Sequence, residues 1–125
     1  MIVGSGVDLC EVDRIRKAVE SSHGQRFVER VFTPGEIVYA TRKASVYQRY
    51  AARFAAKEAA MKALGTSWHG VAWRDFEVVN LPSGRPTLVL HGEAFAIAAK
   101  MGVKYIALSL THTSEQAMAM VILES

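Results

Sequence analysis

The segment Tyr50–Leu64 constrains the fold of this chain more than any other. It is rich in Ala, Lys, Glu, Met and Leu, which favour helix, and Gly65 stands where such a helix would end. On a helical wheel with Phe54 at zero, Lys57 lies at about −60° and Glu58 at about +40°. Both charged residues therefore flank an apolar stripe, where a charge is costly unless it has a partner.

Further helices are predicted on the N-terminal side of this segment. A short strand over Ile2–Leu9 is followed by an amphipathic helix with Val12, Ile15 and Val19 at helical spacing. Thr33–Glu36 supplies a capping Thr, a Pro at the first helical position and a Glu at N3, which predicts another helix start. Between them, Phe27–Val28 and Val31–Phe32 are interpreted only as a short apolar cluster.

Two hairpins are predicted on the C-terminal side. The first pairs Phe76–Val79 with Thr87–Leu90 through the turn Asn80–Pro86. The second pairs Tyr105–Leu110 with Ala117–Leu123 through the turn Thr113–Gln116. A helix predicted over Glu93–Met101 separates the two hairpins. This order of elements predicts one α+β domain over residues 1–125, in which a mostly antiparallel sheet packs against helices.

Composition agrees with one soluble domain. The chain has 125 residues, of which 50% are hydrophobic and 22% charged. The lone Cys10 excludes an internal disulfide and a Cys-based zinc site, and it predicts a reducing, cytoplasmic setting. The N-terminus lacks the pattern of a signal peptide, and no apolar run is long enough to span a bilayer.

The positive charge is concentrated in one block. Residues 14–62 hold eleven of the fifteen Lys and Arg but only four of the twelve acids, so the net charge is +7 there and −4 elsewhere. Such a block predicts an anionic partner, which could be phosphate, nucleic acid or an acidic protein, although a solvated cationic surface has the same pattern.

Asp8 and Glu58 are the first candidates for chemistry. Magnesium prefers oxygen ligands, takes one or two carboxylates and completes its shell with water and substrate phosphate, while Lys57 and Lys62 could neutralise that phosphate. Two structural alternatives stand beside this reading. Glu58 can pair with Lys62 four residues on, and Asp8 can cap the following helix.

His112 is the candidate base. It stands at the predicted end of a strand in Ser109–Thr113, where a side chain can reach a cleft and take a proton from a hydroxyl. The alternative is a hairpin histidine that only bonds to its own turn.

Three separated motifs resemble a known family. Gly6–Glu11, Arg53–Lys62 and Ser109–Thr113 resemble the bacterial holo-[acyl-carrier-protein] synthases, the short members of the 4′-phosphopantetheinyl transferase superfamily. The resemblance covers the whole chain, because Asn80, Gly84 and Pro86 also match the family's turn. It implies transfer of the 4′-phosphopantetheine arm of coenzyme A to a serine of apo acyl carrier protein in fatty acid biosynthesis, with release of adenosine 3′,5′-bisphosphate.

The resemblance also assigns roles by position. Asp8 and Glu58 would bind Mg²⁺, Lys57 and Lys62 would offset charge on the diphosphate and leaving group, and His112 or a metal-bound water would deprotonate the serine. The implied catalytic residues are Asp8, Glu58, Lys62 and His112, and the implied coenzyme A contacts are Lys57, Lys62, Gly84, Arg85, Pro86, Ser109, His112 and Thr113.

The same resemblance implies partners for the basic block. Acyl carrier protein is acidic, and its docking surface would consist of Arg14, Arg26, Phe27 and Arg53, with Arg53 reaching either the carrier or the substrate. The short bacterial members are homotrimers with the coenzyme A cleft between subunits.

Two other functions remain as alternatives. A nucleic-acid-binding module would use the basic block, but it would need exposed aromatic residues among the basic ones. A non-enzymatic homo-oligomer would make Asp8 and Glu58 matter for stability rather than activity.

Overall fold

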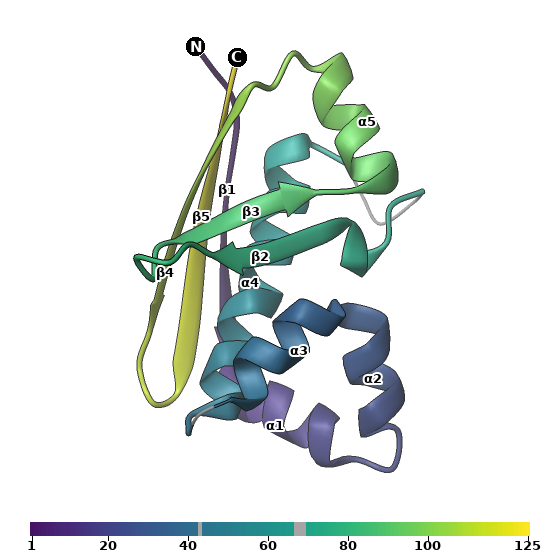
Figure 1. The fold of residues 1–125 in the computed structure, drawn as a ribbon, viewed down its shortest axis with the longest axis vertical. Helices are drawn as coiled ribbons and strands as arrows, with labels where there is room; N and C mark the ends of the chain where they lie inside the picture. Colours follow the sequence, from purple (N-terminus) through teal and green to yellow (C-terminus); the bar gives the residue numbers. More distant parts are fainter. Residues whose placement is uncertain (43, 67–69) are drawn as a thin grey trace.

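The structure is a computed structural model that describes residues 1–42, 44–66 and 70–125. Its elements run in the order β1 (Ile2–Glu11), α1 (Val12–Glu20), α2 (Gly24–Val31), α3 (Pro34–Thr41), α4 (Val46–Leu64), a 3₁₀ turn (Trp73–Asp75), β2 (Phe76–Asn80), β3 (Pro86–Leu90), α5 (Gly92–Lys100), β4 (Tyr105–His112) and β5 (Gln116–Glu124) (Figure 1).

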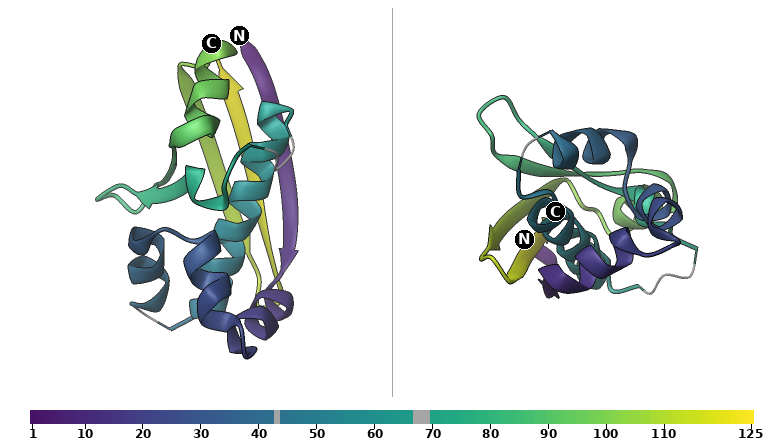
Figure 2. Two further views of the ribbon diagram at one scale, coloured as in Figure 1. Left: turned by 90° about the vertical axis from the view of Figure 1, so that its right-hand side faces the viewer. Right: turned by 90° about the horizontal axis from the view of Figure 1, so that it is seen from below.

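The strands form two antiparallel sheets. In the first, β5 lies between β1 and β4, and in the second, β2 pairs with β3. Asp8 on β1 stands opposite Ala119 on β5, which in turn stands opposite Leu110 on β4. Figure 2 shows α4 against one face of the three-stranded sheet, α1 to α3 around one end of α4, and α5 near the chain termini.

Small residues bring α4 unusually close to β1. A Cβ added to Gly6 would overlap with the carbonyl oxygen of Ala59, and one added to Gly4 would overlap with that of Ala63. The glycines of β1 and the alanines of α4 therefore permit contact between backbones. This contact sets the distance between the side chains that β1 and α4 carry.

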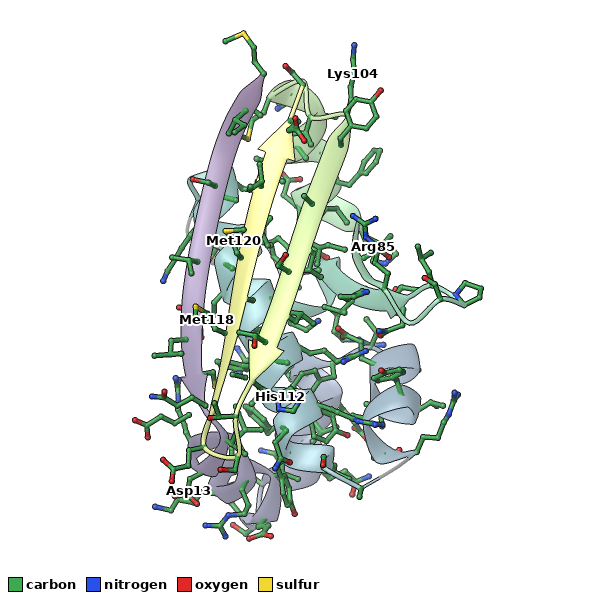
Figure 3. The ribbon with its side chains drawn as sticks, turned by 90° about the vertical axis from the view of Figure 1, so that its left-hand side faces the viewer. Asp13, Arg85, Lys104, His112, Met118 and Met120 are labelled. Atoms are coloured by element: carbon green, nitrogen blue, oxygen red, sulfur yellow. The ribbon has the colours of Figure 1, made fainter. Side chains whose placement is uncertain are left out.

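The opposite face of the three-stranded sheet is open and apolar. Alternation along the strands directs one set of side chains toward α4 and the other set outward. Figure 3 looks onto the open face, where Met118 and Met120 lie on β5. The large apolar side chains exposed on this face are Val3, Val7, Leu9, Tyr105, Met118 and Met120. We call these six residues the open sheet face.

The structure confirms the predicted α+β class with antiparallel pairing, and both predicted hairpins are present. Three local expectations were incomplete. Gly24–Val31 forms a helix, α4 begins at Val46 rather than Tyr50, and β1 continues to Glu11. In the parts of the chain that the structure describes, no helix is both long and apolar enough to cross a bilayer.

Candidate active site

The strand β1 and the helix α4 bring Asp8, Glu58 and Lys62 together. The Lys62 ammonium donates to Asp8 Oδ1 at 2.8 Å and to the carbonyl oxygen of Val7 at 3.2 Å. Glu58 precedes Lys62 by one helical turn, so its carboxylate lies on the same side of α4. The Asp8 side chain is 12% exposed, and the Lys62 side chain is 50% exposed. The group therefore sits at the surface with its carboxylates turned inward.

The carboxylates of this group repel each other. Burial raises the pKa of Glu58, and the charge of Asp8 raises it further, while Arg14 and Lys62 act in the opposite direction. The hydrogen bond to Asp8 raises the pKa of Lys62, which keeps its ammonium charged. Arg14 was predicted only as a docking residue, yet its charge also acts on Glu58.

Both structural alternatives for the carboxylates fail. Helix α1 begins at Val12 with Glu11 as its N-cap, so Asp8 lies inside β1 and does not cap the helix. Lys62 pairs with Asp8 rather than Glu58. Among the residues that the structure describes, Glu58 forms no ion pair, which leaves a half-buried carboxylate without a direct counter-charge.

This donor set fits Mg²⁺. Asp8 and Glu58 place two negative charges close together, and the charge of Asp8 raises the pKa of Glu58, so a divalent cation between them would relieve the repulsion. Within residues 1–42, 44–66 and 70–125, no group of three or more metal-ligating side chains occurs. Two protein ligands are what Mg²⁺ takes when water and substrate phosphate supply the others.

Lys57 lies away from this group. Its side chain is fully buried, and its ammonium forms an ion pair of 2.7 Å with Glu36 Oε1, whose side chain is also fully buried. Burial lowers the pKa of Lys57, and the charge of Glu36 opposes that effect. The structure therefore does not bring Lys57 to Asp8, Glu58 and Lys62. Sequence reasoning missed Glu36, because the capping box accounted for its charge.

Arg53 lies on the same side of α4 as Lys57. It is 3% exposed, stacks on the Tyr39 ring with its guanidinium carbon 4.1 Å from the centroid, and donates to Asn80 Oδ1 at 2.6 Å. Its buried Nε has no hydrogen-bond partner among the residues described. A cavity of about 280 Å³ is lined by Gly35, Tyr39, Arg42, Arg53, Glu77, Val78, Val79 and Asn80. This burial does not suit a docking surface for another protein.

His112 lies at the opposite edge of the sheet from Asp8. Asp8 is on β1 and His112 on β4, with β5 between them, so two strand spacings of about 10 Å in total separate the two strands. Figure 3 shows His112 near the end of β4 and Arg85 on the same side of the sheet. Within a single chain, His112 and Arg85 therefore lie apart from the carboxylates of Asp8 and Glu58.

Ser109 and Thr113 of the same motif do not lie beside the His112 ring. Ser109 is exposed and, three residues before His112 on β4, lies on the opposite face of the sheet. The Thr113 hydroxyl accepts hydrogen bonds from the backbone of Glu115 and Gln116, so Thr113 holds the turn. No described residue forms a hydrogen bond with the His112 ring, and the turn-bonding alternative therefore applies to Thr113 rather than His112.

The predicted docking residues Arg14, Arg26 and Phe27 lie on α1 and α2. Arg14 and Arg26 are exposed, and the Arg14 guanidinium carbon stands 5.3 Å from the Phe54 ring centroid. Phe27 packs on Phe32 and Phe54 at 6.3 Å between centroids. These aromatic rings face one another rather than solvent, so the arrangement does not support a nucleic-acid-binding surface.

Comparison with known proteins decides the family. The model of the 4′-phosphopantetheinyl transferase superfamily matches residues 4–121. The chain belongs to this superfamily. Among curated relatives, the holo-[acyl-carrier-protein] synthase of Solibacter usitatus is 63% identical over 126 residues and all of both chains, and that of Koribacter versatilis is 51% identical over 99% of each.

Solved structures of superfamily members have the same fold. The holo-[acyl-carrier-protein] synthase of Neisseria meningitidis matches over all of both chains with a TM-score of 0.90 and 29% identity. That of Bacillus anthracis, in complex with coenzyme A (3′,5′-ADP), matches all of this chain and 98% of its own with a TM-score of 0.81 and 37% identity. The predicted family and fold are confirmed.

Proposed function

We propose that this transferase moves the 4′-phosphopantetheine arm of coenzyme A to a serine of apo acyl carrier protein in the cytoplasm, as part of fatty acid biosynthesis. Full-length identity of 63% to a holo-[acyl-carrier-protein] synthase is the observation that carries this proposal. The pairing of a β1 carboxylate with the α4 carboxylate and Lys62 supports it, because the family motifs meet there.

Asp8 and Glu58 are the residues that would hold Mg²⁺. When bound, the ion would supply positive charge beside the diphosphate of coenzyme A. Lys62 is half exposed and already rests on Asp8, so its ammonium can move to a phosphate oxygen when that oxygen arrives. Its raised pKa keeps it charged for this role.

The transfer exchanges one bond at phosphorus for another. The serine oxygen of the carrier forms a bond to the phosphorus that bears the pantetheine arm. The bond from that phosphorus to the bridging oxygen breaks, and adenosine 3′,5′-bisphosphate leaves with the electron pair. The serine proton passes to His112 or to water. Histidine is the usual side-chain base in proteins, and the exposed His112 ring forms no hydrogen bond with any described residue, so it is free to take this proton.

The other end of coenzyme A would meet the turn after β2. Gly84 and Arg85 belong to this turn and Pro86 begins β3 directly after it, while Asn80 holds the turn by donating to the Gly84 carbonyl oxygen at 3.0 Å. Arg53 donates to the same Asn80 and has a buried Nε without a partner among described residues, which an anionic group could use. Ser109, His112 and Thr113 complete the coenzyme A contacts in this proposal.

A homotrimer would join the two halves of the site. Asp8, Glu58 and Lys62 lie at one edge of the sheet, whereas His112 and Arg85 lie at the other. Association of subunits through the open sheet face would bury its six apolar residues and place one subunit's β1 edge near another's β4 edge. A cleft between subunits also suits coenzyme A, because so small a domain could not easily enclose it.

The acceptor carrier would dock on α1 and α2. Arg14 and Arg26 are exposed there, and the net charge of residues 14–62 is +7. An acidic carrier complements this charge, which speeds association and selects the partner.

Release of adenosine 3′,5′-bisphosphate tests the proposed reaction. The purified chain is incubated with coenzyme A and Mg²⁺, with and without apo acyl carrier protein, and nucleotides are separated by chromatography. We expect one bisphosphate per carrier modified. Release without the carrier, or none with it, would contradict the proposal.

A further inference from the structure

The buried pair of Lys57 and Glu36 lies outside the site described above. Their charged atoms are 2.7 Å apart, and both side chains are fully excluded from solvent. Burying two charges is costly, and the attraction repays that cost only when the geometry and the surrounding hydrogen bonds are good. A pair of this kind often serves to fix one arrangement of the chain rather than to add stability.

Lys57 has no donor left for a substrate phosphate. An ammonium group has three hydrogen-bond donors. Those of Lys57 go to Glu36 Oε1, to the carbonyl oxygen of Trp73 at 3.2 Å and to the carbonyl oxygen of Phe76. Two of the three acceptors are backbone atoms at the start of β2 and just before it. Lys57 therefore acts on the main chain of β2.

Glu36 ties the same strand to α3. Its Oε2 accepts from the backbone N–H of Val78 at 3.0 Å, and its Oε1 accepts from the backbone N–H of Thr33 at 2.9 Å as well as from Lys57. The pair thus joins α3, α4, the 3₁₀ turn and β2 by four hydrogen bonds, and a fifth, from the Thr33 N–H, closes the capping box of α3; each is buried or partly buried. A satisfied network of this kind fixes its members more firmly than any single bond.

The strand that this pair holds leads directly to the turn assigned to coenzyme A. Asn80 follows Val78 by two residues, accepts from Arg53 and donates to the Gly84 carbonyl oxygen. Arg53 and Lys57 are one helical turn apart, so one side of α4 holds β2 at both its ends. Glu58 and Lys62 occupy another side of the same helix. Helix α4 therefore fixes both the carboxylate site and the turn within each subunit.

We propose that Lys57 and Glu36 are positioning residues that set the turn 80–86 and Arg53 at a fixed place relative to α4. This inference rests on the proposed function, because it concerns how coenzyme A is bound. It assigns Lys57 a different role from the diphosphate contact that the family resemblance implied. Lys57 shapes the site through the backbone of β2 and does not touch the substrate.

A double-mutant cycle on the coenzyme A dissociation constant tests this inference. The variants are Lys57→Met, Glu36→Gln and the double variant, with Lys100→Met as the control that removes an exposed lysine charge from the last turn of α5. Glu36→Gln keeps the size and the acceptor oxygen of Glu36, which favours a folded variant. Affinity is measured by calorimetry at a temperature where circular dichroism shows each variant folded.

The two roles of Lys57 predict opposite results for Glu36→Gln. Positioning predicts that coenzyme A binds about threefold or more weakly, because the anchor of β2 is loosened. A direct phosphate contact predicts equal or tighter binding, because Lys57 is released from its partner. Positioning further predicts that the double variant binds about as weakly as Lys57→Met alone, that KM for coenzyme A rises more than KM for the carrier, and that Lys100→Met binds normally.

Two results would overturn the inference. One is unchanged affinity in folded variants that have lower melting temperatures, since that would show a purely structural pair. The other is Glu36→Gln binding coenzyme A as tightly as the wild type or more tightly while Lys57→Met binds it more weakly, since that would show a direct contact of Lys57 with the substrate. Wild-type activity is measured first. An inactive wild type would contradict the proposed function, whereas the coenzyme A affinities of the variants test the role of Lys57 independently of activity.

Discussion

Lys57 and Glu58 are neighbours in the chain, but α4 directs them to different surroundings. Lys57 is fully buried against Glu36, whereas Glu58 lies half-buried beside Asp8. The sequence predicted that the two residues would lie on opposite sides of the apolar stripe of α4, and for that reason they meet different neighbours. Which side carries the chemistry depends on residues distant in sequence, so the sequence pattern alone could not decide it.

Glu58→Gln should abolish most of the activity while the fold persists. The amide keeps the volume of Glu58 but removes the charge that would bind the cation, so we expect turnover to fall by about 100-fold or more. Glu93→Gln on α5, an exposed change of the same kind, is the control. Turnover is measured against Mg²⁺ concentration, and full activity of Glu58→Gln at low Mg²⁺ would remove Glu58 from the metal site.

Arg14→Glu should weaken binding of acyl carrier protein and leave coenzyme A affinity unchanged. Arg14 is exposed on α1, and reversing its charge places an acid where an acidic carrier would dock. We expect about a tenfold weaker carrier affinity at low salt, with the difference shrinking as salt is added. Equal carrier binding by Arg14→Glu and wild type at low salt would exclude Arg14 from the docking surface.

Elements with strong local signals were predicted well, and those that depend on tertiary contacts were not. The capping box of Thr33 and Glu36 is present as expected, because it needs only residues three apart. Helix α2 was missed, because its short apolar cluster lacks a local cap and gains its stability by packing Phe27 on Phe32 and Phe54. The extension of β1 to Glu11 was likewise hidden, because pairing with β5 determines it.

Gly6→Ala should destabilise the contact between β1 and α4. The added Cβ would overlap with a backbone oxygen of Ala59 that cannot move without shifting the helix. We expect a loss of about 3 kcal/mol in the free energy of unfolding, together with lower activity because Asp8 moves away from α4. Ser5→Ala, on the exposed side of the same strand, should change stability by less than about 0.5 kcal/mol. Urea unfolding measures both, and equal stability of the two variants would contradict the close approach.

The candidate site residues fall at two edges of the three-stranded sheet. The family motifs named these residues from the sequence, but their separation depends on the order β1-β5-β4, which no local pattern specifies. The exposure of the open sheet face was hidden for the same reason, because alternation along a strand identifies an outward side but does not show that its side chains stay exposed among the described residues.

Met120→Lys should dissociate the proposed trimer. Met120 is 45% exposed on the open sheet face, and a lysine there would have to be buried against another subunit. We expect sedimentation at the mass of one chain, 13.7 kDa, and loss of activity. Val38→Lys, at a position 55% exposed on α3, should leave both unchanged. A wild type that is already monomeric and active would contradict the shared cleft.

The proposed function requires this chain to transfer the phosphopantetheine arm in a reaction that needs a divalent cation. The most direct measurement is the intact mass of apo acyl carrier protein after incubation with the purified chain and coenzyme A, with Mg²⁺ or with a chelator. We predict a mass gain of one phosphopantetheine arm with Mg²⁺ and no gain with the chelator. No gain in the presence of Mg²⁺ would contradict the transfer, and an equal gain in the presence of the chelator would contradict the metal site at Asp8 and Glu58.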